Sequence, residues 1–338
     1  MPAIPAPSPT AALINRVLAI KPLWAIAKGR ARAMMVKRAE TIGVPWQARV
    51  AELRSRQGAS QPGTADLSPQ WQADLEAIQN PALQYPDYYT TSFHAYDEGN
   101  LGWQPAMEVE VAAKAVHAKL WPGAGASGDA QLRQSYHDVL TAQLPQAPTA
   151  IVDLGCGVGM STETLQALYP QAQVTGVDLS PYFLAVAQYR QQEQRPQENT
   201  ARPPAPITWH HAAAEDTGLP AASYDLVSAC LIFHELPQTA ARAILQEAHR
   251  LLKPGGHFAI MDMNPQSEVY QQMPAFVLTL LKSTEPYLDE YFALDMAHEF
   301  EAAGFEPPTL TQNSARHRVI VANTTSASKN PDAQPDKP

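Results

Sequence analysis

Residues 150–162 read A-I-V-D-L-G-C-G-V-G-M-S-T, and this stretch decides the fold. Its apolar start, residues 151–154, is short and rich in branched side chains, which predicts a buried parallel strand. A glycine-rich turn follows at once, and Ser161 and Thr162 then open a helical stretch. Glycines let a backbone approach a ligand closely, and the helix N-terminus adds free N–H groups and positive dipole character. We therefore expect a ligand-binding turn built on Gly155, Gly157 and Gly159.

A dinucleotide-binding turn of the form G-x-G-x-x-G is the alternative interpretation of this stretch. The third glycine of that pattern is replaced here by Met160, and a glycine stands one residue earlier, at Gly159. Asp153 would repel a pyrophosphate, whereas its carboxylate suits a ligand with a cationic end, such as the sulfonium and ammonium of S-adenosylmethionine (SAM). On these residues the sequence resembles the class I SAM-dependent methyltransferases, and D-L-G-C-G-V-G is similar to their first motif.

The resemblance covers residues 132–323, and its parts follow the family's order: the glycine turn, an acidic residue after the second strand, Y-D-L-V and K-P-G-G. It implies an α/β fold, a Rossmann-like doubly wound sheet of seven strands with the last strand antiparallel. It also implies that Asp178 accepts hydrogen bonds from both ribose hydroxyls, although the residue can instead cap the helix from Pro181. The cofactor-binding residues implied are Asp153, Gly155, Cys156, Gly157, Gly159, Asp178, Leu179, Ala214, Glu215 and Leu231.

The adenine contact departs from the family pattern. Many relatives carry an aspartate where this chain has Ala213, within the segment A-A-A-E-D that follows the predicted third strand, residues 207–210. Without that carboxylate, we expect the adenine amino group to be held by the backbone at Ala214, with Glu215 or Asp216 compensating.

The segment H-E-L-P follows the predicted fourth strand, residues 223–233. In a doubly wound sheet the carboxyl end of this strand faces the cofactor. The resemblance therefore places His234 and Glu235 near the reactive methyl group. His234 is a candidate base for a hydroxyl acceptor, with Glu235 orienting it, and a purely structural histidine is the alternative.

Residues 85–103 hold six aromatic side chains, although aromatic residues make up only 8% of the chain. No helical or strand period explains them, so the rings must pack on a neighbouring part of the protein or around a flat ligand. The stretch is either a clasp between domains or a substrate lid. The predicted substrate-binding residues are Tyr88, Tyr89, His94, Tyr96 and Trp103 from this stretch, together with Tyr287.

The remaining pattern predicts further elements of the same fold. K-P-G-G at residues 253–256 predicts a hairpin-like turn before a fifth strand over residues 257–263. An apolar helix over residues 268–281 forms either a wall of a hydrophobic pocket or plain core. A helix over residues 291–303 and two strands, residues 308–313 and 316–322, complete the domain.

Composition and charge set the outer limits. Ten basic but only two acidic side chains lie between Met1 and Ser60, so the rest of the chain is strongly acidic and gives the whole chain its net charge of −9. A strongly acidic surface argues against nucleic-acid binding, because phosphate contacts require basic side chains. The basic N-terminal helices either pack on the core or touch anionic lipid. No membrane span, signal peptide or metal site is predicted, and Cys156 and Cys230 suit buried, reduced thiols. We expect a cytoplasmic protein, with membrane contact at most peripheral.

The predicted organisation is a disordered start (1–10), a helical N-terminal domain (11–130), a SAM-binding domain (131–323) and a disordered tail (324–338). The predicted function is methylation of oxygen or carbon on a flat or hydrophobic small molecule, such as a phenol, quinone or lipid-like ring. The alternatives are a protein or RNA methyltransferase and a non-catalytic SAM-binding partner protein. The sequence leaves the acceptor and the oligomeric state open.

Overall fold

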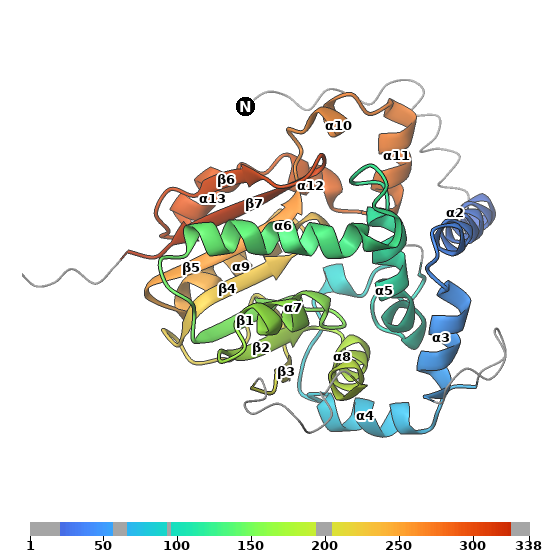
Figure 1. Cartoon of the computed structure of the whole chain (residues 1–338), viewed down its shortest axis with the longest axis horizontal. Coiled ribbons are helices and arrows are strands. Elements are labelled where there is room, and N and C mark those ends of the chain that lie inside the picture. The colour runs from blue at the N-terminus through green and yellow to red at the C-terminus, as the bar shows by residue number, and fades with distance from the viewer. Residues whose placement is uncertain (1–20, 57–65, 93–95, 194–204, 326–338) are drawn as a thin grey trace, which may run out of the picture.

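The structure is a computed structural model that describes residues 21–56, 66–92, 96–193 and 205–325. Seven strands form one sheet in the order β3-β2-β1-β4-β5-β7-β6 (Figure 1). Strands β1 to β5 are parallel, whereas β7 runs antiparallel to both β5 and β6, which confirms the predicted fold class. The strands are β1 (Ala150–Leu154), β2 (Gln173–Asp178), β3 (Thr208–His211), β4 (Tyr224–Cys230), β5 (Leu252–Met263), β6 (Thr309–Gln312) and β7 (His317–Asn323).

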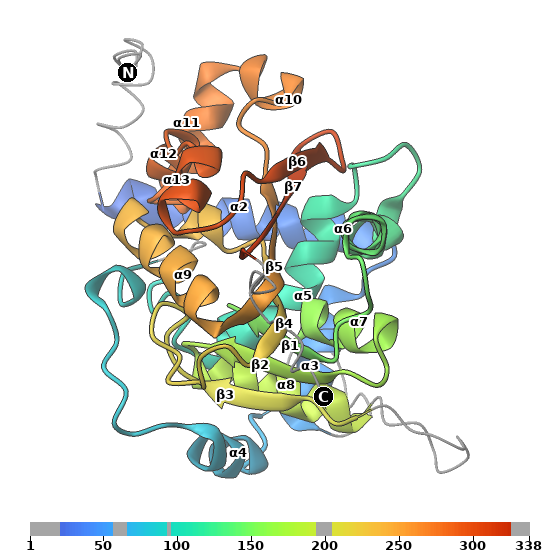
Figure 2. The same cartoon turned by 90° about the vertical axis from the view of Figure 1, so that its left-hand side faces the viewer.

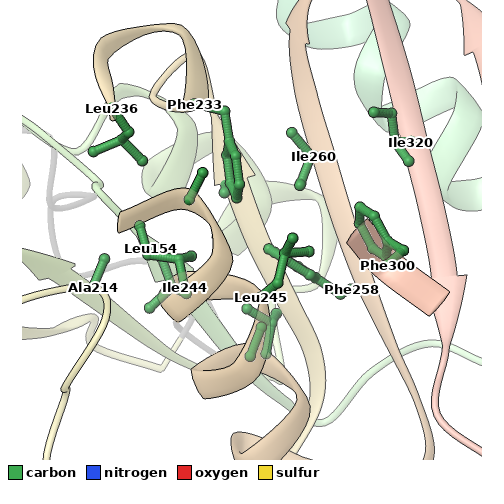
Figure 3. Packing of buried hydrophobic residues seen from close by; sticks show 14 of the residues in the cluster. Leu154, Ala214, Phe233, Leu236, Ile244, Leu245, Phe258, Ile260, Phe300 and Ile320 are labelled. Atoms are coloured by element: carbon green, nitrogen blue, oxygen red, sulfur yellow. The ribbon is translucent and has the colours of Figure 1, made fainter. Parts of the chain in front are cut away.

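Helices cover both faces of the sheet, because the buried strands are apolar on both sides. Helices α6 (Gly128–Gln143) and α7 (Met160–Leu168) lie on one face, and α9 (Gln238–Leu251) and α13 (Met296–Ala302) lie on the other (Figure 2). The α9 side holds the larger core cluster, in which Phe233, Phe258 and Phe300 pack with aliphatic residues from β5, β7 and α9 (Figure 3). Helix α8 (Pro181–Glu193) connects β2 to β3.

Two predicted strand boundaries were wrong for identifiable backbone reasons. The fourth strand ends at Cys230 rather than 233, because Leu231 has a positive φ of 61° and a short 3-10 helix, η3 (Phe233–Glu235), follows. The predicted K-P-G-G turn lies inside β5, which begins at Leu252 and pairs with Tyr224. The pairing of β4 with β5 shifts register between Tyr224 and Leu226, and this shift accommodates the irregular K-P-G-G segment of β5.

Two predicted helices are each divided in two. The apolar segment 268–281 forms α10 (Glu268–Gln271) and α11 (Ala275–Thr284), separated at Pro274, whose ring cannot continue the first helix. The segment 291–303 forms the end of α12 (Leu288–Phe292) and then α13. The Asp295 side chain caps α13 by accepting a hydrogen bond from the backbone N–H of His298 at 3.3 Å.

The N-terminal helices pack against the sheet domain rather than standing apart from it (Figure 1). Trp71 and Met107 are buried with Phe183 and Val186 of α8 in one cluster. The predicted domain boundary at residue 131 falls within α6, and the stretch 123–129 contains a short 3-10 helix, η2 (Gly125–Ser127). The helices concerned are α2 (Lys21–Thr41), α3 (Trp46–Ser55), α4 (Gln70–Ile78) and α5 (Trp103–His117).

Several predictions concern residues outside the described ranges. Residues 11–20 of the predicted helical N-terminal domain, the predicted disordered start and residues 326–338 of the predicted tail belong to this group. The division into two domains and the contact with anionic lipid stay predictions. In the part of the chain that the structure describes, no helix is long and apolar enough to cross a membrane.

Gly159 offers a direct test of the packing beneath the glycine turn. A Cβ there would lie 2.6 Å from the Trp209 ring, and the backbone has a positive φ of 82°. Gly218 has a similar φ of 67° but open space around it, so it is a matched control. We expect Gly218→Ala to lose about 1–2 kcal/mol of unfolding free energy through backbone strain alone. Gly159→Ala should lose about 1–3 kcal/mol more, through overpacking.

Chemical denaturation of both variants measures this difference. Equal losses for the two substitutions would contradict a close contact between the turn and Trp209.

Candidate functional site

The glycine turn leaves β1 at the carboxyl edge of the sheet. Gly155, Gly157 and Gly159 have φ values of 65°, 55° and 82°, a region that side chains other than glycine rarely adopt. A Cβ at Gly155 would lie 2.7 Å from Ile232, so this glycine is required by packing against the segment after β4. A Cβ at Gly157 would meet nothing closer than Phe183 at 3.9 Å. The turn is therefore closed at Gly155 and open at Gly157, where a ligand can reach the backbone.

Asp178 ties the end of β2 to this turn. One carboxylate oxygen accepts the backbone N–H of Gly157 at 2.8 Å, and the other accepts that of Ser180 at 2.7 Å. Burial raises the pKa of Asp178 to about 6, against the lowering effect of these two N–H donors. Each oxygen keeps a second acceptor position, so the carboxylate can hold the turn and still bind a vicinal diol. The neighbouring Leu179 side chain is buried.

Asp153 lies beneath the turn, with its side chain 1% exposed. It accepts a hydrogen bond from the Thr162 hydroxyl at 2.7 Å, and burial raises its pKa to about 6. Arg133 approaches the same place from α6, where it pairs with Asp129 at 2.9 Å and hydrogen-bonds to Ser161. Sequence reasoning missed Arg133, although an aspartate and an arginine four residues apart on a predicted helix were a signal.

The end of β3 carries an unsatisfied acceptor. Tyr88 donates its hydroxyl to Oε1 of Glu215 at 2.7 Å. The other oxygen, Oε2, is buried and has no hydrogen-bond partner among the described residues. A buried acceptor without a donor is costly unless a ligand supplies one. The adenine amino group of SAM is such a donor, so Glu215 fits the compensating position predicted from the missing aspartate at Ala213.

Part of the aromatic stretch closes over this edge of the sheet. Residues 87–89 form a short 3-10 helix, η1 (Asp87–Tyr89), in which the Tyr88 ring meets Tyr287 edge to face at 6.4 Å. The Tyr89 hydroxyl is buried near Asp178 and Glu235, and it lowers the pKa of Asp178. The structure therefore brings Tyr88, Tyr89 and Tyr287 together beside the glycine turn.

The other predicted substrate residues lie elsewhere. Tyr96 donates its hydroxyl to Glu108 at 2.7 Å, within the packing of α2 and α5. Trp103 packs against Trp71 and Tyr182, with ring centroids 5.3 and 5.0 Å away. His94 lies outside the described residues. The second half of the stretch therefore packs with the N-terminal helices, as expected of a clasp, whereas a role of its first half as a substrate lid stays a prediction.

The segment after β4 holds a buried histidine–carboxylate pair. Nδ1 of His234 lies 2.7 Å from Oδ1 of Asp262, the residue before the end of β5. The other Asp262 oxygen accepts the backbone N–H of Phe233 at 2.8 Å and so fixes η3. Burial alone would lower the pKa of His234, but the Asp262 carboxylate raises it to about 10 overall.

Sequence reasoning identified His234 but missed Asp262. Its signal was a lone carboxylate in an otherwise apolar strand, F-A-I-M-D-M. Leu231, with its positive φ, starts the turn that carries His234 towards the site, and its backbone N–H donates to Met261 at 2.8 Å. Glu235 follows His234 on η3. Among the described residues, no cluster of histidine, cysteine, aspartate or glutamate forms a metal site.

Known proteins that this chain resembles include methyltransferases. Residues 152–260 match the family described as methyltransferase domain. An uncharacterized methyltransferase of Synechocystis is 28% identical over 173 residues, which are 51% of this chain and 74% of that protein. A ubiquinone biosynthesis O-methyltransferase of Xanthomonas oryzae is 32% identical over 38% of this chain, and a trans-aconitate 2-methyltransferase of Methylobacterium nodulans is 36% identical over 36%.

The chain spans only 48% and 41% of the latter two relatives. Among solved structures, human N-acetylserotonin methyltransferase in complex with SAM aligns with a TM-score of 0.46 and 17% identity, covering 76% of this chain and 66% of that one. The matched region, 152–260, contains the glycine turn, Asp178 and the turn that carries His234. Residues 152–260 therefore form a methyltransferase domain, and the order of its strands, glycine turn and acidic residue is similar to that of the class I SAM-dependent methyltransferases.

Proposed function

We propose that this protein transfers a methyl group from SAM to an oxygen or carbon atom of a flat or hydrophobic small molecule. The observation that carries the proposal is the convergence, at one edge of the sheet, of the open turn at Gly157, the Asp178 carboxylate, the tyrosines of η1 and His234. When bound, SAM supplies an electrophilic methyl group, and the protein chiefly has to align the acceptor opposite the sulfur.

Different side chains are proposed to bind the cofactor and to enclose the acceptor. Asp178 accepts hydrogen bonds from the ribose hydroxyls, and Oε2 of Glu215 accepts one from the adenine amino group. The rings of Tyr88, Tyr89 and Tyr287 shield the site from water and offer flat apolar surfaces. Enclosure by such rings favours a small acceptor over a protein or RNA segment.

His234 is the candidate base for an acceptor that carries a proton. Its Nδ1 is held by Asp262, which orients the ring and leaves Nε2 as the nitrogen that can accept a proton. Because Asp262 stabilises the imidazolium, the free protein holds this proton at neutral pH. A cationic cofactor nearby would lower the pKa of His234 and so help to release the proton before the acceptor binds.

A transfer experiment tests the proposed function. The protein is incubated with SAM carrying a labelled methyl group and with cell extract, and the products are separated into organic, aqueous small-molecule, protein and RNA fractions. Label in a small-molecule fraction, lost in Asp178→Ala, is the expected result. Label in protein or RNA would contradict the proposal, and SAM binding without any transfer would favour a non-catalytic partner protein.

The affinity for S-adenosylhomocysteine should depend on pH through Asp178. Only the ionised carboxylate accepts both ribose hydrogen bonds, so affinity should be constant above about pH 7 and fall below about pH 6, where the free carboxyl protonates. Asp178→Ala should weaken binding by about 1.5–3 kcal/mol. Calorimetric titration between pH 5 and 8 measures both effects, and unchanged affinity in the variant would remove Asp178 from the site.

The methyl-transfer rate should depend on His234 if the acceptor loses a proton. The wild-type rate should rise with pH, because the base works only in its neutral form and its pKa is raised. His234→Gln should be slower by about 10²-fold or more, with a flat pH profile. Rates and pH profiles that match the wild type would assign His234 a structural role.

A further inference from the structure

Three arginines lie at the edge of the sheet that carries the site. Arg316 directly precedes β7, and its carbonyl accepts the backbone N–H of Asn264 at 2.7 Å, just after β5 ends. Arg318 is paired in register with Asp262, the partner of His234. Arg38 directly precedes Ala39 of α2, which packs against Val111 and Ala115 of α5. The carbonyl of Val116, in the same helix α5, accepts a hydrogen bond from Arg316, and the charge of Arg38 acts on Arg316. Chain segments far apart in sequence thus bring three cations beside the carboxyl ends of β4 and β5.

These three arginines differ from the buried arginines Arg133 and Arg190, which form ion pairs with carboxylates. Arg133 pairs with Asp129, and Arg190 pairs with Glu110 and Glu163. By contrast, the side chain of Arg316 makes one hydrogen bond to the described residues, from Nη2 to the carbonyl of Val116 at 3.3 Å. Among the residues that the structure describes, no ion pair joins this group to a carboxylate. In both Arg38 and Arg318, Nε is buried and has no hydrogen-bond partner within the described ranges.

Such an arrangement is costly in the free protein. Arg318 is 6% exposed, and Arg38 and Arg316 are half-buried. Burial lowers the pKa of Arg316, and the charge of Arg38 lowers it further, although Tyr270 acts in the opposite sense. Arg38 and Arg316 have no ion pair with a carboxylate among the described residues, so holding these two like charges partly out of water is unfavourable, and a bound anion would reverse that cost. Arginine also presents a planar fork of donors that matches a carboxylate or phosphate.

We propose that Arg38 and Arg316 bind an anionic oxygen group of the methyl acceptor, a carboxylate or a phosphate, at the end of the acceptor away from the methylated atom. The inference rests on the proposed function and narrows its substrate class to acceptors that are hydrophobic or flat but carry an anion. Arg318 is paired in register with Asp262, and Arg316 precedes it by two residues, so the proposed anion site lies at the same sheet edge as the His234–Asp262 pair. The acceptor therefore spans from His234 to Arg316.

The stability of the ligand-free protein gives the first test. Arg316→Gln removes an uncompensated cation, so the melting temperature should stay the same or rise. Arg190→Gln is the matched control, because it breaks a buried ion pair and should lower the melting temperature by about 5 °C or more. A similar loss in Arg316→Gln would show that Arg316 supports the fold and would overturn the proposal.

Anion binding gives the second test. The full chain, saturated with S-adenosylhomocysteine, is titrated with sodium benzoate or inorganic phosphate at constant ionic strength set by chloride. The melting temperature of the wild type should rise with one of these anions, and the preferred one distinguishes a carboxylate from a phosphate. Arg38→Gln and Arg316→Gln should each weaken this effect about 10-fold or more. Arg242→Gln should leave it unchanged, because Arg242 is exposed and pairs with Glu299.

The absence of a shift with either anion, or equal shifts in wild type and Arg316→Gln, would overturn the anion site. The transfer assay separates this result from a failure of the proposed function. A labelled product should be retained on an anion-exchange column and should form more slowly in Arg316→Gln through a raised KM. A labelled product that is neutral and forms equally in the variant would overturn this inference alone, whereas the absence of any transfer would count against the proposed function.

Discussion

The structure of the site depends on one carboxylate, that of Asp178, which accepts backbone N–H groups from the glycine turn and from the start of the next helix. These two bonds join the carboxyl ends of β1 and β2, so the turn keeps the positive φ angles that leave its backbone open at Gly157. The carboxylate is buried and its pKa is raised, so keeping it ionised lowers the free energy of unfolding of the ligand-free protein. A ligand whose hydroxyls donate hydrogen bonds to this carboxylate offsets part of that loss of stability.

Other buried polar atoms around the site also lack, among the described residues, a hydrogen-bond partner that a ligand could supply. In the part of the chain that the structure describes, Glu215 has a buried oxygen without a donor, and Arg38 and Arg318 each have a buried Nε without an acceptor. The unsatisfied acceptor lies on the side where adenine is proposed to bind, and the unsatisfied donors lie on the side proposed for the acceptor. His234 and Asp262 stand between them as a satisfied pair that fixes the turn after β4. The polarity of the site therefore changes from acidic to basic along the carboxyl edge of the sheet.

The features that sequence alone predicted are those encoded locally. The strand, glycine turn and helix of residues 150–162 are contiguous, and Asp178 ends a strand whose position follows from the order of the elements. Features that depend on pairing between distant segments were missed. Asp262 reaches His234 only because β5 lies beside β4, and Arg318 meets Asp262 only through the antiparallel register of β7. Tyr96 and Trp103 were expected beside Tyr88, but packing against Glu108 and Trp71 draws them to the N-terminal helices.

We propose that the carboxylate of Asp178, which holds the glycine turn, also holds the cofactor. The most direct measurement is a crystal structure of the protein with S-adenosylhomocysteine at about pH 7.5, above the raised pKa of Asp178. We predict that both ribose hydroxyls lie within hydrogen-bond distance of Asp178, that the adenine amino group lies on Glu215 and that the sulfur lies on the side of His234. A ligand whose ribose lies away from Asp178, with the carboxylate still bound only to Gly157 and Ser180, would contradict it.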